Sequence, residues 1–143
     1  MAGRWSAPLL LGLALMAGCG SSTSGATDDD LIKQELRRGV GQIRAIHDRH
    51  KLITELARGL ARLGRARGST AGVERARELA MQGFEATMKG TRSQLDFSEN
   101  DSGEVAAATR DAARADRYLT LGANRLRAAG RLLGIHVGKL NQY

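Results

Sequence analysis

The feature that most constrains this chain is a repeat of apolar and small residues between Val105 and Leu140. Successive members are three or four residues apart, which is the spacing of a helix that buries one continuous seam against a partner. The members are Val105, Ala108, Ala112, Ala115, Leu119, Gly122, Leu126, Ala129, Leu133, His136 and Leu140. Leu121, Leu132 and Ile135 flank this seam and are expected to widen it. The repeat therefore predicts one long, coiled-coil-like helix.

Helical spacing also predicts a helix from about Leu31 to Gly64. The acidic residues 28–30 precede it, at the end of a helix where the macrodipole favours negative charge. Gly39 and Gly41 are positions at which this helix could bend. Its predicted seam consists of Leu36, Gly39, Ile43, Ile46, His50, Ile53, Ala57 and Leu60.

A further helix is predicted from about Thr70 to Ser93, with Thr70 as its N-cap. Its buried stripe consists of Val73, Ala76, Ala80, Phe84, Met88 and Leu95. After it, the D-x-x-E sequence from Asp101 to Glu104 has the form of a capping box. We therefore expect the helix that begins near Val105 to be capped by these residues.

Together these segments predict an all-α fold, an elongated up-down-up three-helix bundle. Pro8 is the only proline, so no proline interrupts the predicted helices. The connections near residues 65–69 and 95–101 are short and polar, which makes successive helices antiparallel neighbours. Because aromatic residues make up only 3% of the chain, the core must be built from aliphatic side chains and alanine. Such close packing disfavours a large ligand pocket.

The amino-terminal segment has the pattern of a secretory signal. Arg4 precedes an apolar run from Leu9 to Ala17, which is shorter than the roughly 20 residues of a membrane-spanning helix. Met16-Ala17-Gly18-Cys19 follows, and Cys19 is the only cysteine. This segment resembles the precursor of a bacterial lipoprotein, with these four residues as its lipobox. The resemblance implies cleavage before Cys19, a diacylglyceryl group on its sulfur and acylation of the new amino terminus.

The resemblance divides the chain into a signal peptide (residues 1–18), a lipidated cysteine with a flexible linker (19–30) and a helical domain (31–143). Two or three acyl chains give lasting membrane attachment, whereas one chain gives only marginal binding. The expected location is the cell membrane or outer membrane, facing away from the cytoplasm. A signal peptide with a chance cysteine, or a membrane-embedded helix, remains the alternative.

The candidate metal ligands are His47 and His50, which are three residues apart in "IHDRH". Helical bundles bind metals with this spacing when other helices contribute carboxylates and a Glu-x-x-His motif. No such motif occurs here, and His136 is predicted to lie at a different level of the bundle. The sequence therefore predicts no metal site and no cofactor, with partly buried seam histidines as the interpretation.

The sequence contains no set of residues with the spacing of a known catalytic or nucleotide-binding motif. An EF-hand loop starting at Asp96 fails, because Asp101 stands where the glycine is needed. A P-loop through Gly59 and Gly64 fails, because Arg65 and Ala66 replace its Lys-Ser/Thr pair. We therefore expect a protein that is not an enzyme.

The arginines are the remaining feature of the sequence that bears on function, and the chain has a net charge of +7. With Val105 as heptad position a, Arg110, Arg117 and Arg131 share the outermost position f, and Arg114 and Arg127 flank them. A basic surface favours anionic partners, although it is also compatible with a simple solvated face. Nucleic acid is not expected, because no stacking aromatics accompany the arginines.

The predicted function is that of a membrane-anchored lipoprotein whose basic helical domain contacts anionic envelope components or a protein partner. An envelope bundle that binds a metal or small ligand is the alternative. Pairing of the Val105–Leu140 helix between two chains is a further option.

Overall fold

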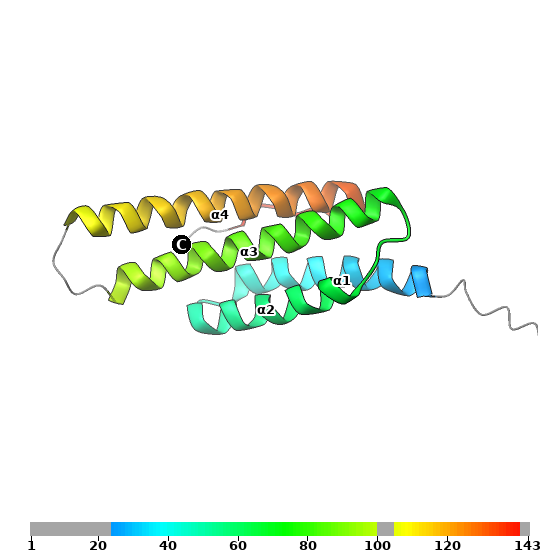
Figure 1. The fold of residues 1–143 in the computed structure, drawn as a ribbon, viewed down its shortest axis with the longest axis horizontal. Helices are drawn as coiled ribbons and strands as arrows, with labels where there is room; N and C mark the ends of the chain where they lie inside the picture. The colour runs from blue at the N-terminus through cyan, green and yellow to red at the C-terminus, as the bar shows by residue number, and fades with distance from the viewer. Residues whose placement is uncertain (1–23, 100–104, 141–143) are drawn as a thin grey trace, which may run out of the picture.

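The computed structural model describes residues 24–99 and 105–140, and within these ranges it is all-α, with no strand. The helices are α1 (Ser24–Ala45), α2 (Arg49–Arg65), α3 (Ala71–Glu99) and α4 (Val105–Leu133). Figure 1 shows an elongated molecule in which α3 and α4 form a long antiparallel hairpin, with the shorter α1–α2 hairpin beside it. The signal segment, Cys19 and the predicted capping box at Asp101–Glu104 lie outside the described residues.

The predicted three-helix bundle is corrected to four helices, because the segment from Leu31 to Gly64 forms two helices. The chain leaves helical geometry after Ala45, and Asp48 becomes the N-cap of α2 with extended backbone angles (φ −71°, ψ 110°). Its Oδ1 atom accepts a hydrogen bond of 3.0 Å from the backbone N–H of Lys51. An aspartate that satisfies such an N–H favours a new helix start over continuation of the old one.

The break also changes which side of the segment is buried. In α1 the predicted seam residues Leu36, Gly39 and Ile43 are buried, together with Ile32 and Val40. In α2 the predicted members His50 and Ala57 are exposed, and the buried residues are Leu52, Leu56, Gly59 and Leu63. The second half of the predicted seam was therefore wrong at His50 and Ala57, whereas Ile53 and Leu60 are partly buried against the core. A helix that restarts after a break can turn a different side toward the core.

The start of α1 overlaps the predicted flexible linker, because residues 24–30 are helical. The acidic cluster therefore lies inside α1 instead of preceding the helix. Asp28 accepts a hydrogen bond from the backbone N–H of Arg67 (3.1 Å), and Asp29 accepts one from that of Ser69 (2.8 Å). These bonds hold α1 against the connection between α2 and α3.

Helix α3 confirms the predicted start and most of the predicted stripe, but it continues past Ser93 to Glu99, into the predicted connection. The hydroxyl of Thr70 accepts a hydrogen bond of 3.2 Å from the backbone N–H of Val73, which is the predicted N-cap. Ala76, Ala80, Phe84 and Met88 of the predicted stripe are buried. Phe84 is fully buried against Gly39 and Gly59, where a side chain would collide with its ring. Gly39 therefore makes room for an aromatic side chain and does not break α1.

Helix α4 is shorter than predicted, because it ends at Leu133 and the seam to Leu140 is not one helix. Gly134 has a φ of +66°, and the N–H of Ile135 donates to the carbonyl of Gly130 at 2.8 Å. This is a Schellman end, in which a glycine with positive φ stops the helix. The following chain turns back, so that Leu140 is buried while His136 is exposed.

Among the described residues, two charged side chains are buried, Glu35 and Arg77. Glu35 of α1 receives two hydrogen bonds from Arg62 of α2, at 2.7 and 2.9 Å. Arg77 of α3 bonds Glu74 at 3.0 Å and the carbonyl of Leu63 at 3.1 Å. The Glu35–Arg62 pair therefore joins α1 to α2, and the bond from Arg77 to the Leu63 carbonyl joins α3 to α2. Removing Arg62 would leave the buried charge of Glu35 without this partner.

Candidate functional site

The candidate site is the side of α4 that faces away from α3. We define the outer α4 face as a line of residues spaced by three or four along the helix: Arg110, Arg114, Arg117, Leu121, Arg125, Ala128 and Leu132. The residues buried against α3 follow a different line, including Ala115, Gly122, Leu126 and Ala129. The two acidic residues of α4, Asp111 and Asp116, do not belong to the outer face.

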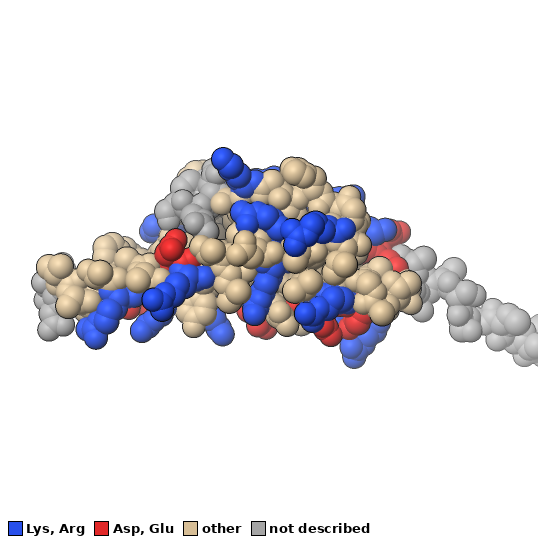
Figure 2. All heavy atoms as spheres, turned by 90° about the horizontal axis from the view of Figure 1, so that it is seen from above, with Lys and Arg blue, Asp and Glu red and all other residues tan. Residues whose placement is uncertain are grey.

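Arginines and two leucines therefore share a largely exposed side of α4. Leu121 is 39% exposed and Leu132 is 50% exposed, although both were predicted to widen the buried seam. That prediction was wrong, because α3 covers only one side of α4. Figure 2 looks down on α4 and shows Lys and Arg side chains spread along most of the length of this side of the molecule.

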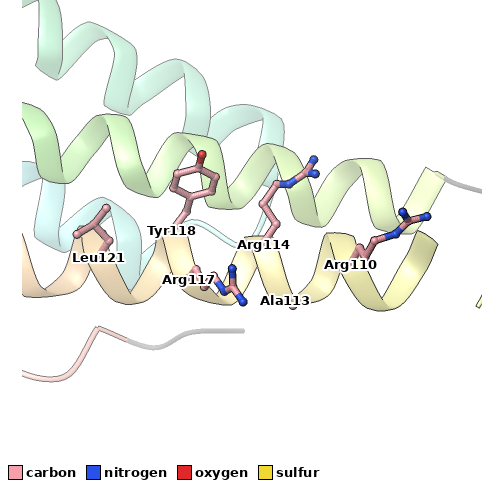
Figure 3. Close-up of a pocket in the computed structure, with 6 residues that line it drawn as sticks. All are labelled: Arg110, Ala113, Arg114, Arg117, Tyr118 and Leu121. Atoms are coloured by element: carbon pink, nitrogen blue, oxygen red, sulfur yellow. The ribbon is translucent and has the colours of Figure 1, made fainter. Parts of the chain in front are cut away.

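The amino-terminal half of the outer face contains a hollow of about 530 Å³. It is lined by Arg110, Ala113, Arg114, Arg117, Tyr118 and Leu121, which all project from α4 (Figure 3). The methyl group of Ala113 is small, so the surrounding longer side chains enclose open space. Tyr118 extends the hollow toward α3, where the Nζ atom of Lys89 lies 5.9 Å from the centre of its ring.

The three guanidinium groups of the hollow differ in their local contacts. Arg114 lies 3.6 Å from the carboxylate of Asp111, in a pair exposed enough to be weak. The Nε atom of Arg110 donates to the carbonyl of Ala106 at 3.2 Å, which leaves its charge uncompensated. Within residues 24–99 and 105–140, neither Arg110 nor Arg117 forms an ion pair with an acidic side chain. The hollow thus carries a net positive charge.

The arginine side chains of the hollow are suited to binding anions. Guanidinium groups form paired hydrogen bonds with phosphate and carboxylate oxygens. Arg110 and Arg117 are about 10 Å apart along the helix axis at 1.5 Å per residue, so the hollow can contact more than one anionic group. Among the described residues, the side chains that line the hollow include no carboxylate, histidine, cysteine or serine.

The histidines considered for metal binding lie apart from this hollow. His47 is in the break between α1 and α2, where its Nδ1 atom is 3.2 Å from the carbonyl oxygen of Ala45. His50 is in the first turn of α2, and its Nε2 atom is 4.0 Å from Glu99. The prediction of one shared helix face, and of seam burial, was wrong because both rings are exposed. The described ranges contain no group of three or more His, Cys, Asp or Glu residues suited to a metal ion.

Comparisons with protein-family models, curated proteins and solved structures found no match to this chain. Among the described helices, none combines the length and apolar character needed to cross a bilayer.

Proposed function

We propose that this chain is a membrane-anchored bacterial lipoprotein, not an enzyme, whose basic helical domain contacts anionic components of the cell envelope. The arginine-lined hollow on the outer α4 face carries the proposal. Two of its three guanidinium groups have no acidic partner in the described parts of the chain, so an external anion can neutralise them. Cys19 and the lipobox residues before it supply the proposed anchor.

Binding of the processed chain to anionic vesicles and to isolated wall fragments, over a series of salt concentrations, tests this function. The test variant is Arg110→Gln/Arg114→Gln/Arg117→Gln. Each basic side chain near an anionic surface contributes about 1 kcal/mol, so three of them correspond to about a 100-fold loss of affinity at low salt. Binding by the unchanged protein should weaken as salt rises, because screening shortens the reach of each charge.

The matched control is Arg37→Gln/Arg65→Gln/Arg67→Gln, which removes the same charge from exposed positions elsewhere. We expect it to bind close to normally. Equal losses in the two variants would show that net charge, and not the α4 hollow, determines binding. Mass analysis of the protein from membranes tests the anchor separately, since Cys19 should carry acyl groups and Cys19→Ser should be released.

A second candidate function is binding of a protein partner, and the partner that we propose is a second copy of this chain. A hollow of about 500 Å³ lies between α3 and α4 near the start of α2, and Phe97 on its wall is 47% exposed. Arg49 and Asp116 both line it, so a two-fold arrangement could pair the arginine of each copy with the aspartate of the other. Sedimentation of Phe97→Ser beside the unchanged chain tests this candidate.

A further inference from the structure

The outer α4 face combines charge with exposed apolar surface, and this combination selects among anionic partners. Four large apolar side chains are exposed in the described residues: Phe97, Val105, Leu121 and Leu132. Two of them, Leu121 and Leu132, lie on the same line as Arg110, Arg114 and Arg117. These leucines are about 16 Å apart along the helix axis, so the face offers two separate apolar contacts.

We infer that the outer α4 face lies flat on an anionic bilayer, with its arginines at the lipid phosphates and Leu121 and Leu132 among the headgroups. This inference rests on the proposed function and names the anionic component as lipid. A hydrated wall polymer can neutralise the arginines, but it gains nothing from exposed leucines. Binding to a bilayer surface strengthens with the apolar area buried and with the electrostatic attraction to anionic lipids, and the outer α4 face supplies both.

The position of the proposed anchor permits this orientation. Five peptide units separate Cys19 from Ser24, where α1 begins, and they span at most about 18 Å. Helix α1 contacts α4, so their axes are about 10 Å apart, and the outer surface of α4 lies about 5 Å beyond its own axis. The linker is therefore long enough to cover the distance from the α1 axis to the outer surface of α4. Figure 1 also shows that α1 starts at the end of the molecule where α4 finishes.

The experiment measures the depth of a single tryptophan in the bilayer. Trp5 is the only tryptophan and belongs to the proposed signal peptide, so the processed chain has none. Lipidated Leu121→Trp is reconstituted in phosphatidylcholine vesicles that contain phosphatidylglycerol and brominated lipid. Ala61→Trp, at an exposed position of α2, is the control. We expect a blue-shifted, strongly quenched emission from Leu121→Trp and much weaker quenching from Ala61→Trp.

Adding the three Arg→Gln changes at positions 110, 114 and 117 to Leu121→Trp should remove most of the quenching, because the anchor alone does not orient the domain. Equal quenching of Leu121→Trp and Ala61→Trp would overturn the inference. Soluble anionic polymer is then added to the same vesicles. If the protein captured polymer through its arginines but showed no quenching, the bilayer contact would be refuted and the proposed function would stand. If it showed neither quenching nor polymer capture, the bilayer contact and the proposed function would both be refuted.

Discussion

The packing of Phe84 predicts that alanine has opposite effects at two neighbouring glycines of α1. The ring is fully buried and faces Gly39. A Cβ atom at Gly39 would lie closer than 3.0 Å to ring atoms, whereas no atom lies within 4 Å of a Cβ at Gly41. The two positions are in the same helix, so Gly41→Ala is a matched control for Gly39→Ala.

The expected magnitudes follow from two opposing effects. Alanine in place of glycine within a helix stabilises by about 1 kcal/mol at both positions. At Gly39 the added methyl group also displaces Phe84, and overpacking of this kind costs about 1–3 kcal/mol. The ring has little room to retreat, because a Cβ at Gly59 would lie only 3.3 Å from its Cε2 atom. We therefore expect Gly39→Ala to lower the free energy of unfolding by about 1–2 kcal/mol, and Gly41→Ala to raise it by about 0.5–1 kcal/mol.

Urea denaturation followed by circular dichroism measures both changes, with an unchanged dependence on urea as the sign that the same structure unfolds. The double variant Gly39→Ala/Phe84→Leu should recover part of the loss, because the smaller side chain relieves the collision. If Gly39→Ala were as stable as Gly41→Ala, Phe84 would not occupy the space above Gly39, and the packing of α1 on α3 would have to be revised.

Three further predictions concern capping and buried charge. Asp48→Ala should lower the free energy of unfolding by about 1 kcal/mol in chemical denaturation, because it removes the N-cap of α2, whereas Asp48→Asn should be nearly neutral. Arg62→Met should cost about 3 kcal/mol by the same measurement, since Glu35 stays buried with only Arg38 at 3.6 Å, and adding Glu35→Leu should restore most of it. Hydrogen bonds from Arg77 and from the backbone N–H of Gly68 lower the pKa of Glu74 from 4.5 to about 2. Its stabilising contribution is therefore complete above about pH 4.5 and is lost as the pH falls toward 2, so acid titration of Glu74→Gln should show a weaker loss of stability over that range.

Much of the helix content could be predicted from the sequence, because the apolar spacing in α3 and in the middle of α4 continues without interruption. The break at Asp48 was missed, although the sequence contains a signal for it. Leu52, Leu56 and Leu63 are themselves spaced by four and seven, but they are out of phase with Leu36 and Ile43. A change of phase within one segment indicates two helices, and Asp48 lies at that change.

The arginines of the candidate site could be predicted from the sequence, but the exposure of its leucines could not. The spacing of Arg110 and Arg117 shows from the sequence that they share one side of a helix. Whether Leu121 is buried depends on how many neighbours surround that helix, which no local pattern determines. The end of α4 was missed because Gly134 is one of 18 glycines, and only the return of the chain onto Gly130 distinguishes it.

The close packing of α4 on α3 explains why the outer α4 face can remain open. A Cβ atom at Gly122 would lie 3.0 Å from the carbonyl oxygen of Gly83, and one at Gly90 would lie 2.7 Å from the Cγ atom of Leu119. Glycines at these points let the two backbones approach, so one partner gives α4 most of its packing contacts. A helix stabilised from one side needs no cover on the other. The packing of the bundle therefore leaves the arginines and leucines of that side available for the bilayer contact that we propose.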